Sequence, residues 1–103
     1  MKSKKFKELL AANPENELFR FSLGQSFMDE GNPNEAIPLF EKCQRKKPDW
    51  MMASILKAKC HMALERMEEA RFELNRALKL AIEQEHEAPK AEIRKLLAVI
   101  SQN

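Results

Sequence analysis

The sequence predicts an all-α fold, a helical solenoid of antiparallel helix pairs, on three observations. Helix-forming residues dominate the composition, a helix–turn–helix hairpin occupies residues 18–46, and related residues recur at an interval of 34 along the chain. Stacked hairpins of this kind share one continuous core, because a single hairpin cannot bury its own apolar face. With 103 residues the chain is expected to form one domain.

The composition also limits the classes of function. Charged residues make up 33% and apolar residues 44% of the chain, which contains two glycines and no tyrosine. The formal net charge of +2 is close to balance, whereas a dedicated nucleic-acid binder usually shows a concentrated basic face. No apolar run approaches the ~20 residues of a membrane span, and no apolar signal segment follows the N-terminal lysines. We therefore expect a cytoplasmic protein that binds neither nucleic acid nor a membrane.

The hairpin is the best-defined unit of the sequence. Apolar residues follow helical spacing from Leu18 to Met28, and the breaker residues at 31–33 end this helix before a second one starts. Gly24 in the first helix and Ala36 in the second are small. Small residues that face each other let two antiparallel helices approach closely, so we expect tight packing at Gly24.

The interval of 34 residues relates this hairpin to the segments before and after it. The correspondences include Pro14 with Pro48, Phe6 with Phe40 and then Leu74, Gly24 with Ala58, and Glu35-Ala36 with Glu69-Ala70. Several independent offsets agree, which indicates repeated structural units. The segment before Pro14 corresponds to the second helix of a hairpin, so the chain begins with half a repeat.

These residues resemble the tetratricopeptide repeat, whose pattern is W-x2-L-G-x2-Y … A-x3-F … P. The first copy reads Arg20-x2-Leu23-Gly24-x2-Phe27 … Ala36-x3-Phe40 … Pro48, with Arg20 where the family has tryptophan. The second copy is weaker and contains Ser54, Lys57-Ala58, His61 and Ala70-x3-Leu74, with Ile82 where proline is usual. The resemblance covers residues 2–82. It implies a right-handed superhelical scaffold for protein–protein interaction, and it names no partner.

The single TPR-like domain 1–103 divides into four units. They are a capping half repeat at 2–13, repeat 1 at 15–48, repeat 2 at 49–85 and a C-terminal capping helix at 88–102. Pro14 and Pro48 close the first two units, because proline cannot continue a helix and restricts the residue before it. Both end helices have one apolar stripe on an otherwise polar surface, as expected of the caps of a solenoid.

Six helices are expected within these units. Their approximate ranges are 3–12, 15–30, 35–46, 50–64, 67–85 and 89–101. Asparagine and proline at 32–34 are start signals for the third helix, and Pro38 is expected to bend it slightly or to delay its start. Asp49 is expected to cap the fourth helix. The turn at 65–66 lacks a glycine, in contrast to the turn at Gly31.

One face of the first helix of each repeat remains for function, because its other faces pack on neighbouring helices. On the first repeat this face carries Leu18, Phe21, Gln25 and Met28, and the 34-residue shift gives Met52, Ile55, Lys59 and Met62. The resemblance implies that these faces line a concave groove that binds extended peptides or helices. Most of the eight residues are apolar, and methionine suits adaptable contact surfaces. The alternative is that the C-terminal helix or neighbouring helices cover most of them.

One subclass of the family clamps a C-terminal carboxylate with lysine, asparagine and arginine on the groove faces. Phe21, Gln25, Met52 and Leu56 stand where those side chains would be expected, so the resemblance to this subclass fails. We therefore expect the partner to be an apolar peptide or an amphipathic helix of another protein. The alternative is a homo-oligomer, such as a homodimer, that buries the same face.

The sequence gives no indication of catalysis, a cofactor or a metal. It has no Gly-rich phosphate loop, no H-E-x-x-H and no G-x-S-x-G. Cys43 and Cys60 are expected to be small buried hydrophobes. Cys60 and His61 point about 100° apart on a helix, so they do not converge on one ion. His61 takes the slot of Phe27 and is expected at the edge of the core. Trp50 is expected to anchor the repeat junction, with a partner contact as the alternative.

Overall fold

The computed structural model describes residues 1–102, in which it contains six α-helices and no strand. The helices are α1 (Lys2–Ala12), α2 (Glu17–Asp29), α3 (Pro33–Lys46), α4 (Met51–Ala63), α5 (Met67–Glu83) and α6 (Glu87–Ser101). Each helix packs against the next one along the chain, and α2 also contacts α4. The expected fold class, an all-α solenoid of antiparallel helix pairs, is confirmed.

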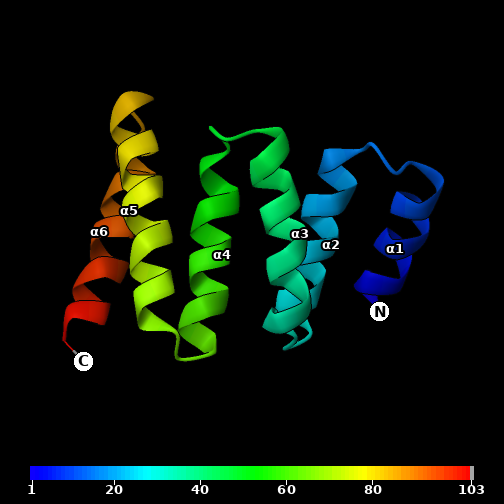
Figure 1. Cartoon of the computed structure of the whole chain (residues 1–103), viewed down its shortest axis with the longest axis horizontal. Helices are drawn as coiled ribbons and strands as arrows, with labels where there is room; N and C mark the ends of the chain where they lie inside the picture. The colour runs from blue at the N-terminus through cyan, green and yellow to red at the C-terminus, as the bar shows by residue number, and fades with distance from the viewer. Residues whose placement is uncertain (103) are drawn as a thin grey trace.

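The helices run alternately in opposite directions, so their turns gather at two opposite edges of the molecule (Figure 1). The turns 13–16, 47–50 and 84–86 lie along the edge at the top of Figure 1, which we call the upper edge. The molecule is elongated, with extents of 41 × 28 × 20 Å. The first turns of α2, α4 and α6 therefore share the upper edge with the last turns of α1, α3 and α5.

Gly24 marks a very close approach of α2 to α3. A Cβ atom placed on Gly24 would lie 2.7 Å from Cε1 of Phe40, whose side chain is fully buried. The tight packing predicted at Gly24 is therefore present. The side chain nearest to Gly24 is the ring of Phe40 rather than Ala36, the small residue that we had expected to face it.

Two clusters of buried apolar side chains hold the helices together. One cluster, around Phe40 and Leu56, joins α2, α3 and α4, and the half-buried Phe6 of α1 packs against it. The other cluster, around Ile55 and Ile93, joins α4, α5 and α6. Each fully buried side chain of this size contributes about 1.5–3 kcal/mol. Because α4 supplies residues to both clusters, it is the central helix of the fold.

A buried polar cluster connects α3, α4 and α5. The amide nitrogen of Gln44 donates to Oγ of Ser54 at 3.0 Å and to Oε1 of Glu73 at 2.7 Å. The ammonium of Lys57 lies 3.2 Å from Oε2 of Glu73. Glu73 is only 4% exposed, and a carboxylate so deep requires partners of this kind. The repeat pattern does not predict this cluster, because it does not pair polar residues of three different helices.

Five of the six helix starts differ from the expected ones by one or two residues. α3 begins at Pro33, because proline fits the first turn of a helix, and Pro38 lies within the helix instead of delaying it. The expectation that Asp49 caps α4 is wrong, since Trp50 directly precedes the helix and no side chain caps it. In α2 the side chain of Asn16 does cap, and it accepts a hydrogen bond from a backbone N–H of the first turn at 3.0 Å.

Three turns contain a residue in the left-handed region of backbone space. Gly31 has φ 78°, Glu65 has φ 59° and Glu85 has φ 58°. Glycine adopts this conformation freely, whereas a residue with a Cβ atom is strained by roughly 1–2 kcal/mol. Gly31 and Glu65 correspond under the 34-residue shift, so the second repeat keeps the backbone of this turn without its glycine.

Candidate functional site

Leu18 and Met52 expose large apolar side chains on the upper edge. Leu18 lies in the first turn of α2 and is 69% exposed, and Met52 lies in the first turn of α4 and is 40% exposed. The two residues correspond under the 34-residue shift, and their helices contact each other. Single exposed apolar residues are ordinary, but a group of them on one face indicates a contact site.

A pair of aromatic rings joins α2 to the start of α4. Phe21 and Trp50 stack with their ring centroids 4.8 Å apart and 21° between the planes. Phe21 also meets the buried Phe40 edge-on, with centroids 5.6 Å apart. Both Phe21 and Trp50 are half-buried, so the stack anchors the junction and still presents aromatic surface outward. Trp50 thus packs as expected and adds to the apolar surface, although the groove predicted from the sequence did not include it.

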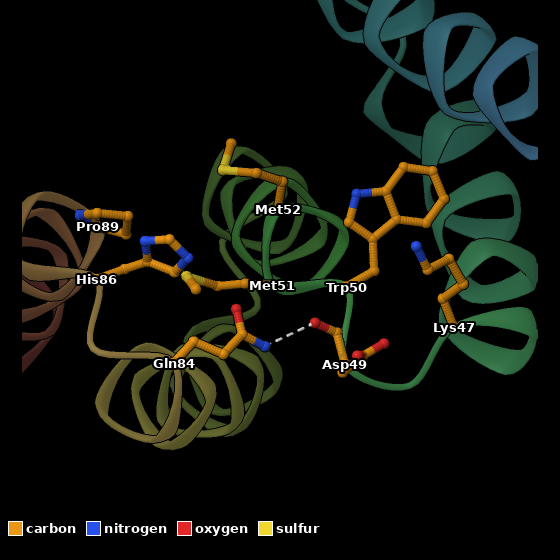
Figure 2. A pocket seen from close by; sticks show the side chains of 8 residues that line it. All are labelled: Lys47, Asp49, Trp50, Met51, Met52, Gln84, His86 and Pro89. Carbon is orange, nitrogen blue, oxygen red and sulfur yellow. Dashed lines mark hydrogen bonds between the residues drawn. The ribbon is translucent and has the colours of Figure 1, made fainter.

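A hollow of about 520 Å³ opens beside this stack, between the α3–α4 and α5–α6 turns. Figure 2 shows its lining residues, which are Lys47, Asp49, Trp50, Met51, Met52, Gln84, His86 and Pro89. The amide nitrogen of Gln84 donates to the backbone carbonyl of Asp49 at 3.1 Å and ties the two turns together. The ammonium of Lys47 lies 5.8 Å from the Trp50 ring centre. The hollow extends the surface of Trp50 and Met52 toward α6.

The structure exposes the eight predicted groove residues to different degrees. Three of them are exposed (Leu18, Gln25 and Met52), four are half-buried (Phe21, Met28, Lys59 and Met62), and one, Ile55, is buried. Ile55 is 1% exposed because it packs in the cluster that joins α4 to α5 and α6. Its side chain therefore offers no surface to a partner, contrary to what we expected of this residue.

The first turns of α6 lie beside the α4 face below Met52. The ammonium of Lys59 lies 3.3 Å from a carboxylate oxygen of Glu92, and only a small hollow of about 210 Å³ remains between the two helices. α4 starts 34 residues after α2, whereas α6 starts 36 residues after α4. The 34-residue shift therefore cannot predict which side chains α6 places against Ile55.

The part of the face toward the lower edge is more polar. Gln25 and Met28 line a separate hollow of about 350 Å³ between α1, α2 and α4. Its other lining residues are Lys2, Phe6, Ser22, Ser26, Asp29 and Leu56. The apolar part of the predicted face is thus concentrated at the upper edge, around Leu18, Phe21, Trp50 and Met52.

Both cysteines and His61 are buried. Cys43 and Cys60 are free thiols, and burial raises the pKa of each to about 11, so both stay protonated at neutral pH. Burial, with help from the nearby Lys57 ammonium, lowers the pKa of His61, whose Nδ1 has no hydrogen-bond partner. Within residues 1–102, no three His, Cys, Asp or Glu residues gather as metal ligands would. None of the six helices has the length and apolar character of a membrane span.

The fold and this face together define a class of protein, the all-α repeat proteins that stack helical hairpins. A family model described as anaphase-promoting complex, cyclosome, subunit 3 matches residues 5–77. This match covers more than half of the chain, so the chain belongs to that family, and the resemblance to tetratricopeptide repeat proteins is confirmed. No curated protein sequence matches the chain significantly.

Solved structures of other repeat proteins share the fold. PcrH of Pseudomonas aeruginosa, in complex with the chaperone-binding region of PopD, has a TM-score of 0.89 at 21% identity, over 97% of this chain and 76% of its own. The type III secretion translocator chaperone SycD of Yersinia enterocolitica has a TM-score of 0.90 at 19% identity, over 97% of this chain and 70% of its own. The TPR2B domain of yeast Sti1, in complex with pHsp70, has a TM-score of 0.88 at 24% identity, over 97% of this chain and 80% of its own.

Proposed function

We propose that this chain is a non-enzymatic protein-interaction module that holds an apolar peptide or an amphipathic helix of another protein. The observation that carries the proposal is the apolar edge, defined as Leu18, Phe21, Trp50 and Met52. Two of its members are exposed and two form a half-buried aromatic stack. Aromatic side chains and methionine are typical of the energetic centres of protein contacts.

Two further observations support this proposal. The similar structures of PcrH and of the Sti1 domain contain bound partners, the chaperone-binding region of PopD and pHsp70. The 520 Å³ hollow beside Trp50 offers space for one large side chain of a bound segment. In the proposed arrangement the apolar edge makes the main contact. The segment continues past Gln25 and Met28, while Lys59 and Met62 lie at its margin and Ile55 supports the surface from below.

A capture experiment with two matched variants tests the proposal. Leu18→Glu combined with Met52→Glu places two carboxylates on the apolar edge. Phe72→Glu places one on α5, where Phe72 is 68% exposed and lies away from this face. Substitution of exposed side chains usually changes stability by no more than about 0.5 kcal/mol, so each variant should fold. Circular dichroism checks the fold before each chain is used as bait in a lysate of the source organism.

We expect wild type and Phe72→Glu to capture the same protein, and the double variant to lose it. Capture by the folded double variant at the wild-type level would contradict the proposal. Equal loss in Phe72→Glu would also contradict it, because the contact would then not be specific to the apolar edge.

A further inference from the structure

A hollow of about 390 Å³ is lined by residues of α3, α4 and α5, and we call it the α3–α5 hollow. In Figure 1 α4 lies between the other two helices. The lining residues are Glu41, Gln44, Arg45, Pro48, Lys57 and Arg76. None of them also lines the hollow beside Trp50, so the α3–α5 hollow is separate from the apolar edge.

Two arginines in this lining have no partner for their charge. Arg45 of α3 is exposed and Arg76 of α5 is half-buried. Neither side chain has a hydrogen bond or an ion pair with any residue in the described range 1–102. A guanidinium has five N–H donors and a permanent positive charge, and withdrawing such a group from water is unfavourable unless an acceptor replaces the water. The pair is therefore suited to bind an anion from outside the chain.

The third cation of the lining, Lys57, belongs to the polar cluster of α3, α4 and α5. Its side chain is only 13% exposed, and its ammonium lies 3.2 Å from Oε2 of Glu73 and donates to Oε1 of Gln44 at 3.4 Å. Because Glu73 compensates the charge of Lys57, the uncompensated positive charge of the hollow comes from the two arginines. Glu41 opposes an incoming anion, since its carboxylate lies 3.8 Å from the Lys57 ammonium.

Two guanidinium groups on one hollow favour a phosphoryl group over a carboxylate. One guanidinium fork binds both oxygens of a carboxylate, which leaves the second fork without an acceptor. A phosphoryl group offers three oxygens and a charge of about −1.5 to −2 at pH 7, so it can accept from both forks. The lining contains no aromatic side chain on which the base of a nucleotide could stack. The hollow therefore suits a phosphorylated side chain better than a nucleotide.

We propose that the α3–α5 hollow binds the phosphoryl group of a phosphorylated side chain on another protein. Arg45 and Arg76 bind its oxygens from two different helices. Lys57 adds a positive charge that the polar cluster holds in place, and Glu41 limits the affinity. This inference goes beyond the proposed function and does not depend on it, because the α3–α5 hollow and the apolar edge share no residue.

An NMR titration with a short phosphopeptide tests the proposal. The probe is a pentapeptide with blocked ends, a phosphoserine between two pairs of glycines, and the signals followed are those of the arginine Nε–Hε groups. The signals of Arg45 and Arg76 should shift as the peptide is added. Arg71, an exposed arginine of α5 outside the lining, should not shift. The same peptide with serine should not bind, and the peptide with glutamate should bind more weakly than the phosphopeptide.

Four variants sharpen this test. Arg76→Gln removes one fork and should weaken binding of the phosphopeptide roughly tenfold or more. Arg76→Lys keeps the charge without the fork and should also bind more weakly than wild type. Arg71→Gln makes the same change of charge on α5 and should bind like wild type. Glu41→Gln removes the competing carboxylate and should tighten binding by roughly twofold to fivefold.

Any of four outcomes would overturn the proposal. They are unchanged signals of Arg45 and Arg76, equal affinity for the phosphoserine and serine peptides, wild-type affinity in Arg76→Gln, and an equal loss in Arg71→Gln. Inorganic phosphate is titrated in parallel. If it shifts both arginine signals while the phosphopeptide does not, the hollow binds the free anion and the assignment to a protein side chain is wrong.

Discussion

Gly24 lies against the ring of Phe40, which occupies the space that a side chain at residue 24 would need. A Cβ atom at Gly24 would lie 2.7 Å from Cε1 and 2.8 Å from Cζ of that ring. Phe40 cannot move aside easily, because it is fully buried and touches Phe21 edge-on. We expect Gly24→Ala to lower the free energy of unfolding by roughly 1–3 kcal/mol through overpacking, measured by urea denaturation.

A double-mutant cycle gives the control for this prediction. Phe40→Leu removes the ring atoms that the new Cβ would meet, at the cost of a cavity. The cost of Gly24→Ala should therefore be smaller in the Phe40→Leu background than in wild type. Equal costs in the two backgrounds would contradict the account of the close approach.

His61 should make stability depend on pH. Its pKa in the folded chain is lowered from the ordinary 6.5, so between the two values the unfolded chain binds more protons than the folded one. The free energy of unfolding should therefore fall as the pH drops below about 6.5. Hydrogen bonds from Ser3 lower the pKa of Glu30, but that contribution is lost only below the ordinary carboxyl value of 4.5.

Urea denaturation at pH 7 and at pH 5.5 checks this dependence. His61→Phe introduces the ring of the equivalent Phe27. This variant should show a smaller difference in the free energy of unfolding between the two pH values than wild type does. His86→Gln, at an exposed site, should leave the change as in wild type. If the difference in the free energy of unfolding persists in His61→Phe, another titratable group causes it and the account of His61 is wrong.

Single residues also show how far the sequence predicts the candidate site. The repeat pattern placed Leu18 and Met52 on one face, because the face of a helix follows from spacing alone. It placed Ile55 on the same face, but Ile55 is buried in a cluster that also contains residues of α5 and α6, and helical spacing does not predict such tertiary packing. The outward surface of Trp50 depends on its stacking with Phe21, which no local pattern encodes.

At the scale of elements, the turn between α4 and α5 is strained where the turn between α2 and α3 is not. Glu65 has φ 59°, whereas the equivalent Gly31 has φ 78°. We expect Glu65→Gly to raise the free energy of unfolding by up to about 1 kcal/mol, since the relief of strain exceeds the entropy that glycine loses on folding. Thermal unfolding checks the sign. Glu68→Gly, inside α5, is the contrasting control and should destabilise.

The polar cluster sets how α3, α4 and α5 fit together. Glu73→Ala removes one of the two acceptors of the Gln44 amide and the nearer carboxylate partner of Lys57, so we expect the free energy of unfolding to fall by roughly 1–3 kcal/mol or more. Lys57→Met combined with Glu73→Leu replaces both charges by apolar groups and should recover most of the loss. Chemical denaturation of the single and double variants measures both effects. A double variant as unstable as Glu73→Ala would contradict this account of the cluster.

Most of the elements themselves could be predicted. Apolar spacing and proline placed six helices where the structure has them, because both signals act locally. The cap of α4 was predicted wrongly at Asp49, because Trp50 directly precedes the helix and no side chain caps it.

At the scale of the whole molecule, the same helices build the core and limit the contact face. α6 completes the cluster around Ile55 and closes the lower part of the α4 face through the ion pair of Lys59 with Glu92. What remains open and apolar lies on the upper edge, next to the basic end of α3 and the acidic end of α5. The proposed contact surface is therefore one edge of the solenoid rather than its full length.

The most direct test of the central claim is site-specific photocrosslinking at this edge. A benzophenone side chain is placed at Leu18, at Met52 or at Phe72, all of which are exposed, and each chain is irradiated in a lysate of the source organism. The account predicts the same crosslinked partner protein from Leu18 and Met52, and none from Phe72. Crosslinks from Phe72 alone, or equal crosslinks from all three sites, would contradict it.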